Sequence, residues 1–175
     1  NEIWNKYLDG SPGEVTLPSD GEYFFQVRSE DSFEAYVGPY SFAFRSAPAP
    51  EEFDLGDVTD VREISADLPE AGMGRIETYN GEDWYRFHAN AGEVALFEDL
   101  GSSSEGFFFE TPVWSLISPT GEVLFTDSLD NWGFGVRVFP VTGEYEIQVW
   151  FHNLGTGTYS FRVQPVPAID RFTIA

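Results

Sequence analysis

The sequence contains no cysteine, which excludes disulfide bonds, zinc sites with thiolate ligands and thiol catalysis. Basic residues are also scarce: 9 Lys and Arg stand against 30 Asp and Glu, and the formal net charge is −21. A surface of this charge repels phosphate backbones and anionic lipids, so we expect no nucleic-acid partner. No apolar run approaches the length of a membrane-spanning helix, so we expect no membrane insertion. The same acidity suits the binding of hard cations such as calcium.

Aromatic residues are abundant instead, with 17 Phe, 8 Tyr and 5 Trp, which is ample material for a packed core. Short segments rich in β-branched and aromatic residues recur along the chain, and most alternate in polarity as half-buried strands do. These segments are 23–27, 84–88, 93–97, 113–117, 123–125, 136–139, 145–151 and 159–163. Turn signals separate them. The pattern predicts an all-β fold, an antiparallel and jelly-roll-like β-sandwich.

One stretch of the sequence occurs twice. Gly21–Val27 reads GEYFFQV, and Gly143–Val149 reads GEYEIQV 122 positions later. A second matched pair, Gly38–Phe44 and Gly157–Val163, follows in the same order at a spacing of 119. Matched segments that keep their order with one short loop deletion indicate a duplicated structural unit.

The repeat suggests a domain organisation. Because the second copy ends near Ala175, residues 52–175 are expected to form a complete module. Residues 1–51 then correspond to the rear part of a preceding module plus a Pro-rich linker. They are expected to add N-terminal strands, and the 175 residues would be part of a longer array of modules. Their open strand edges are expected to pair with the complete module or with a neighbouring chain by strand complementation. The alternative is one larger sandwich with pseudo-symmetric halves.

A series of short motifs resembles a known family. In chain order they are Asp83-Trp84-Tyr85-Arg86-Phe87, Ala91-Gly92, Pro119-Thr120-Gly121, Gly143-Glu144-Tyr145 and Gly157-Thr158-Tyr159. Over about residues 52–175, their order and spacing are similar to those of the bacterial pre-peptidase C-terminal domain. This resemblance implies a β-sandwich that serves as a non-catalytic appendage of secreted or surface proteins, with calcium bound near the N-terminal segment in some members. The usual acidic-Pro-Asn opening is absent, and the insertion 102–110 is unusual.

Two groups of side chains are candidate calcium ligands, because calcium takes its ligands from loop carboxylates and carbonyls. The first group comprises Asp57, Asp60, Asn80, Glu82 and Asp83. The second comprises Asp127, Asp130 and Asn131, whose spacing falls short of an EF-hand loop. The alternative for each group is a solvated acidic loop, and Asp83 could instead accept hydrogen bonds from turn amides.

Some aromatic residues are candidate contacts for a sugar or a protein ligand, because flat apolar faces pack against flat ligands. They are Phe107, Phe108, Phe109, Trp114, Trp132 and Trp150. Core packing is the alternative, and it is the preferred interpretation for Trp84 and most of the Phe residues. Consecutive strand residues point to opposite faces, so at least one residue of 107–109 must face away from a single core.

The sequence offers little for catalysis. Gly101–Gly106 fails the nucleophile pattern G-x-S-x-G because Glu105 stands where the second Gly belongs. The two histidines have no marked acid partner, and no acid pair is singled out for glycoside hydrolysis. We therefore expect no enzyme, but a spacer or adhesion module of a secreted or cell-surface bacterial repeat protein, rigidified by calcium. The alternative is a carbohydrate- or protein-binding module that targets an associated enzyme to its substrate.

Overall fold

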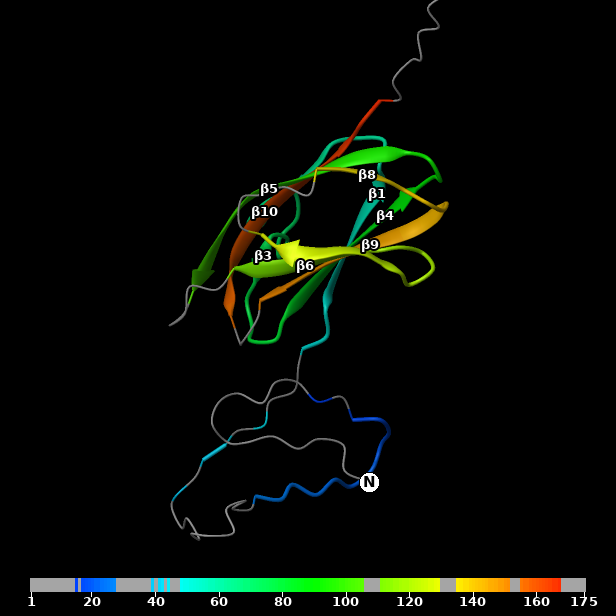
Figure 1. Cartoon of the computed structure of the whole chain (residues 1–175). Helices are drawn as coiled ribbons and strands as arrows, with labels where there is room; N and C mark the ends of the chain where they lie inside the picture. Colours follow the sequence, from blue (N-terminus) through cyan, green and yellow to red (C-terminus); the bar gives the residue numbers. More distant parts are fainter. Residues whose placement is uncertain are drawn as a thin grey trace, which may run out of the picture. The chain divides into compact units, whose positions relative to one another are not determined.

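The computed structural model describes residues 15, 17–27, 39, 41, 42, 44, 48–105, 111–129, 135–151 and 155–167 (Figure 1). The chain divides into two compact units, an N-terminal unit of residues 1–46 and a C-terminal unit of residues 47–175. The predicted boundary lay at 51/52, and the interpretation of residues 1–51 as part of a preceding repeat stays a prediction. The described residues contain no helix that could span a membrane.

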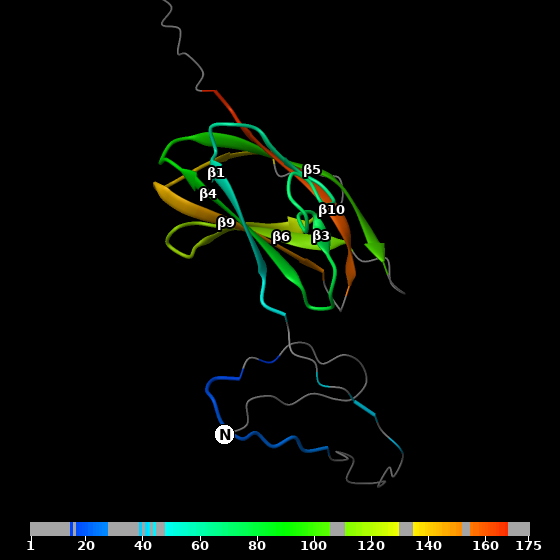
Figure 2. The ribbon, with the colours of Figure 1, turned by 180° about the vertical axis from the view of Figure 1, so that it is seen from behind.

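The C-terminal unit is a β-sandwich, which confirms the predicted fold class. Its two layers are visible from both sides in Figures 1 and 2. One sheet has the strand order β1-β4-β9-β6-β7, and the other has the order β2-β10-β5-β8 with β3 also paired to β10. The strands are β1 (Glu51–Asp57), β2 (Arg62–Ile64), β3 (Arg75–Ile76), β4 (Glu82–Ala89), β5 (Val94–Glu105), β6 (Pro112–Ile117), β7 (Val123–Ser128), β8 (Gly135–Val138), β9 (Gly143–Phe151) and β10 (Thr156–Pro165).

Alternation along the strands builds the core between the sheets. Along β4 and β9 every second residue is buried, so Phe87 and Tyr145 face inward and their rings stack at 5.7 Å. From the other sheet, Phe161 on β10 meets Trp114 on β6 with ring centroids 5.6 Å apart. Aromatic pairs of this kind add specific geometry to the burial of apolar area.

Seven of the predicted segments fall on strands β4 to β10, whereas β1, β2 and β3 were not predicted. β1 runs parallel to β4, with Glu51 opposite Asp83 and Asp57 opposite His88. All other strand pairs between the described residues are antiparallel. The parallel pairing matters for the site, because it determines which end of β1 lies beside Asp83.

In the N-terminal unit, the predicted strand 23–27 is not a strand in the structure. Its local turn is nevertheless formed: the Tyr23 hydroxyl donates to the carbonyl oxygen of Ser19, and the Ser19 amide lies 3.3 Å from the same hydroxyl. Three rings also gather there, with Phe25 at 4.6 Å from Phe42 and 5.1 Å from Phe44. The turn therefore forms although 23–27 pairs as a strand with none of the residues that the structure describes.

Candidate functional site

Asp83 is an acidic side chain inside the core. The alternation of β4 directs it inward together with Tyr85 and Phe87, and it is only 1% exposed. Among the described residues, no other Asp, Glu, Lys, Arg or His side chain is buried. A buried carboxylate requires hydrogen-bond partners, because its desolvation is otherwise too costly.

Two tyrosines supply these partners. The Tyr159 hydroxyl, from β10 in the opposite sheet, donates to Asp83 Oδ2. The hydroxyls of Tyr85 and Tyr159 are 2.7 Å apart, and the amide of Gly74 donates to the Tyr85 oxygen at 2.8 Å. Since each hydroxyl has a single proton and that of Tyr159 goes to Asp83, the Tyr85 proton faces Tyr159 at 2.7 Å, with Asp83 Oδ2 farther away at 3.5 Å. The result is a chain of hydrogen bonds from Gly74 to Asp83 that joins the two sheets.

The surroundings raise the pKa of Asp83 to about 7, first because burial disfavours the charged form and then because the carboxylates of Glu51 and Glu77 lie nearby. The hydrogen bond from Tyr159 acts in the opposite direction. Burial and the charge of Glu51 likewise raise the pKa of Glu77 above its ordinary value. The site can therefore hold or release a proton near neutral pH.

The space beside this carboxyl is small. A depression of about 30 Å³ is lined by Pro48, Ala49, Glu51, Ile76, Glu77, Thr78, Gly81, Glu82 and Asp83. That volume suits about one water molecule. A second depression, of about 170 Å³, lies near Arg75 and Glu105. Both are smaller than the roughly 300–1,000 Å³ typical of small-molecule sites.

The described calcium candidates contact other groups. Asp57 Oδ1 lies 3.6 Å from His88 Nδ1, and Asp60 Oδ2 lies 4.0 Å from Arg62. Glu82 accepts a hydrogen bond from the Trp84 indole, and Asp127 accepts one from the amide of Ser128. Asn80 occupies the turn before β4 with a φ of 58°.

The register separates members of the first calcium group. Because β1 is parallel to β4, Asp57 lies opposite His88, at the other end of β4 from Asp83 and roughly 17 Å away along the strand. Across the described parts of the chain, no three His, Asp or Glu side chains are grouped closely enough to hold a metal ion. Calcium binding by the described candidates therefore stays a prediction. Asp130 and Asn131 lie outside the described residues.

The two described aromatic candidates lie in different environments. Trp114 is fully buried in the core, whereas Trp150 is half-buried on the outer face of β9. Phe107, Phe108, Phe109 and Trp132 lie outside the described residues. The core interpretation of Trp84 is wrong: β4 turns Asp83 inward, so Trp84 points outward and is half-buried. Trp84 pairs with Gln148, and Glu82 with Trp150, so the two indoles are diagonal neighbours on one outer face.

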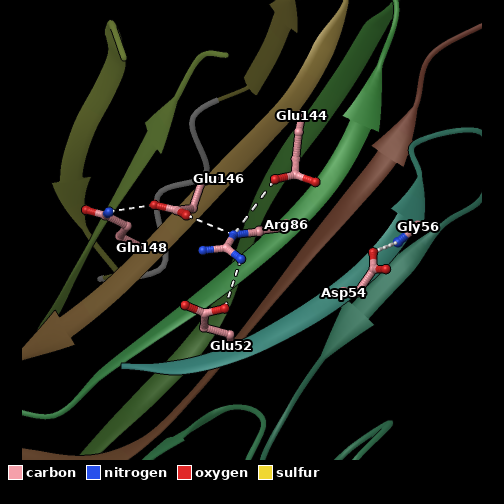
Figure 3. A network of polar contacts seen from close by, with 7 residues as sticks. All are labelled: Glu52, Asp54, Gly56, Arg86, Glu144, Glu146 and Gln148. Atoms are coloured by element: carbon pink, nitrogen blue, oxygen red, sulfur yellow. Dashed lines mark hydrogen bonds and ion pairs between the residues drawn. The ribbon is translucent and has the colours of Figure 1, made fainter. Parts of the chain in front are cut away.

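The same outer face carries an ionic network centred on Arg86 (Figure 3). Its guanidinium lies 2.8 Å from Glu52 on β1 and, on β9, 3.2 Å from Glu146 and 3.9 Å from Glu144. Gln148 extends the network by donating to Glu146 at 2.7 Å. One cation thus serves three carboxylates across three strands.

Sequence reasoning missed the roles of Tyr85, Tyr159 and Glu77. The sequence does contain a signal for Tyr85. Asp83, Tyr85 and Phe87 are two residues apart along one strand, so their side chains point to the same, inward face. An acid in that row had to be buried and paired. The identity of its partner on β10 was not readable, since it depends on how the sheets stack.

No protein-family model matches the sequence, and no curated protein matches it. Among solved structures, the chain is similar to Aeromonas hydrophila PliG, a periplasmic inhibitor of g-type lysozyme, at 14% identity and a TM-score of 0.45, covering 67% of this chain and 100% of that one. Salmonella Typhimurium PliG matches at 17% identity and a TM-score of 0.43, with coverages of 66% and 99%. The pre-peptidase C-terminal domain of Bacillus anthracis collagenase matches at 12% identity and a TM-score of 0.40, with coverages of 69% and 100%.

Proposed function

We propose that the chain is a non-catalytic β-sandwich module of a secreted or cell-surface bacterial protein that is built from repeated modules, and that it acts as a spacer or adhesion unit. One observation carries this proposal: the same tyrosine turn occurs in both units. Tyr23 donates to the carbonyl of Ser19, and Tyr145 donates to the carbonyl of Val141 at 2.6 Å.

The two turns agree in further detail. The amides of Ser19 and Val141 each lie 3.3 Å from the tyrosine hydroxyl four residues later. The intervening glycines, Gly21 and Gly143, have φ values of 155° and 152°, a conformation that other residues rarely adopt. Shared sequence, contacts and backbone angles at one constant spacing support duplication of a module, which is the basis of an array.

The described polar groups support a structural role. Asp83 and the two tyrosines bond to one another between the sheets. Arg86 neutralises carboxylates on the outer face, and Arg162 does so on the other sheet with Glu63 at 2.7 Å and Glu98 at 3.2 Å. These hydrogen bonds and ion pairs stabilise the fold, and the two depressions are small. In this proposal, the module therefore acts by setting the length and stiffness of the array.

The prolines near the boundary and the negative net charge both favour an extended arrangement of modules, as a spacer requires. Pro48 and Pro50 restrict the backbone at the start of the C-terminal unit, directly after the boundary, because proline fixes φ and removes an amide donor. A net charge of −21 makes neighbouring modules repel each other at low ionic strength.

Small-angle X-ray scattering of the whole chain tests this proposal. A spacer should show a maximum dimension that shortens as salt is raised from about 10 mM to about 1 M, because the screening length falls from about 30 Å to about 3 Å. A compact particle whose dimensions do not change with salt contradicts it.

A second candidate, a carbohydrate-binding module, is favoured by the adjacency of Trp84 and Trp150 on one outer face. Two indoles beside Gln148 and Glu82 combine flat apolar surface with hydrogen-bonding groups, which is the chemistry that sugars need. Pull-down on insoluble polysaccharides tests it: binding that is lost in Trp84→Ala and Trp150→Ala but kept in Arg162→Ala supports this candidate. Absence of binding to every polysaccharide favours the spacer.

A further inference from the structure

Equivalent positions of the two repeats differ sharply in burial. In β9 and β10, Tyr145, Ile147 and Phe161 are completely buried and Val163 is 2% exposed. Their counterparts in the N-terminal unit, at spacings of 122 and 119, are Tyr23, Phe25, Phe42 and Phe44. These are 38–73% exposed. Residues that build a core in one copy therefore form a surface in the other.

The exposed rings are not scattered. Phe25, Phe42 and Phe44 lie within 4.6–5.3 Å of one another, measured between ring centroids. Together they form one face, here called the aromatic face. A contiguous apolar face of this kind marks a surface that is built to be covered.

The C-terminal unit shows what covers the equivalent residues. β9 lies between β4 and β6, and β10 lies between β2 and β5. The ring of Phe87 stacks on Tyr145, while Phe161 meets Tyr85 at 5.2 Å and Trp114 at 5.6 Å. The rings are therefore covered by the inward row of β4 and β6, while β5 pairs with β10 at its edge.

We propose that the aromatic face is covered by strands equivalent to β4, β5 and β6 of a further module of the same kind, carried by the same polypeptide. This inference rests on the proposed function, because it takes the two units as repeats. It also explains why 23–27 is not a strand: a β9-type segment requires a partner on each side. One polypeptide is the favoured source, because β4, β5 and β6 precede β9 in the chain of the complete module.

The pairing has a defined register. In the C-terminal unit, Phe87 lies opposite Tyr145 and Tyr85 lies opposite Ile147. The covering strand should therefore place its Phe87 equivalent opposite Tyr23 and its Tyr85 equivalent opposite Phe25. A slip of one residue would turn the whole inward row to solvent, so this register is strongly specified.

An extended chain tests the proposal. A second copy of residues 47–122 is joined ahead of residue 1, which reproduces the spacing of the complete module while all 175 natural residues are kept. Hydrogen exchange is followed for the amides of 22–27. They should become at least about 100-fold better protected than in the natural chain, since a paired strand exchanges only through opening.

Matched variants separate core contacts from general effects. Phe25→Glu should abolish the gained protection, because the counterpart of Phe25 is the buried Ile147. Phe24→Glu should preserve it, because Phe24 is 89% exposed and its counterpart Glu146 faces the Arg86 network outside. The amides of β4 and β9 in the natural C-terminal unit provide the internal reference.

Unchanged exchange at 22–27 overturns the proposal, as does an equal effect of the two glutamate variants. Failure of the added copy to become protected also overturns it, because those strands would then lack the partner that the N-terminal unit is proposed to supply. None of these results depends on the scattering or polysaccharide experiments, so the spacer function can fail separately.

Discussion

The hydroxyl of Tyr159 on β10 donates a hydrogen bond to the carboxylate of Asp83 on β4, and this contact joins the two sheets across the core. The residues are 76 positions apart in the chain. Tyr85 supports the pair, and the amide of Gly74 completes the chain of donors. Such a network is stabilising only while every member is satisfied, so it makes the fold sensitive to protonation and to small substitutions.

Protonation of Asp83 should set part of the pH dependence of stability. Its pKa is about 7 in the folded chain against an ordinary 3.8, so the folded state holds the extra proton between these values. The free energy of unfolding contributed by Asp83 should therefore be greatest below about pH 4 and fall as pH rises to about 7. Asp83→Asn, which stays neutral, should remove this component in urea unfolding measured from pH 4 to pH 8.

The exposed Glu122→Gln is the control for this experiment, because it removes the same charge outside the core. Relative to wild type, Asp83→Asn should gain stability as pH rises, whereas Glu122→Gln should not show that trend. A difference between Asp83→Asn and wild type that is the same at every pH would contradict the assignment.

Tyr159→Phe should destabilise the chain by about 1–3 kcal/mol at pH 8, since it removes the donor to a buried carboxylate. The loss should be smaller at pH 5, where Asp83 is protonated. Because this hydrogen bond lowers the pKa of Asp83, the variant should also move the fall in stability to higher pH. Tyr79→Phe, at a position 49% exposed, is the comparison. Equal losses at both pH values would show that Tyr159 acts only through packing.

Replacement of Arg86 by Met should lower the melting temperature at low salt, because Glu52, Glu144 and Glu146 lose their shared cation. Salt at about 1 M should shrink the difference, since exposed charges are screened within about 3 Å. Adding Glu146→Gln to Arg86→Met should restore part of the melting temperature at low salt. Thermal unfolding by circular dichroism at two salt concentrations measures this, and a salt-independent loss would indicate that the aliphatic stem matters more than the charge.

Calcium binding stays a prediction of the sequence. An ion that binds only the folded chain raises the melting temperature with increasing calcium, and a chelator reverses the rise. Calorimetric melting with about 5 mM calcium or EDTA tests it, with magnesium as the control for general screening of the acidic surface. If calcium acts through a specific site, magnesium should give the smaller rise. Identical melting in calcium and in chelator would rule out a structural ion.

Much of the fold was readable from local patterns. Alternation identified the segments of β4 to β10, and the duplicated tyrosine turn was visible as GEY in both copies. Alternation also implied that Asp83 and Trp84 face opposite sides, although aromatic content alone suggested a core position for Trp84. β1 was not readable, because its acidic sequence EEFDLGD becomes a strand only by pairing with β4.

The candidate site was less readable, because its members meet only through the stacking of the sheets. Asp57 and Asp83 belong to one predicted group of calcium ligands, yet the parallel register of β1 puts them at opposite ends of β4. Glu51 and Glu77, which add to the effect of burial in raising the pKa of Asp83, belong to no recognisable motif.

By itself, the sequence determined an all-β chain, its acidic surface, the direction of most strand side chains and the repetition of a turn, because each follows from composition or from spacings of a few residues. Only the tertiary structure decided that Tyr159 and Gly74 would serve Asp83, and that identical turns would be core in one unit and surface in the other. Those outcomes depend on which strands lie beside and across from one another, and that order comes from contacts between residues far apart in the chain.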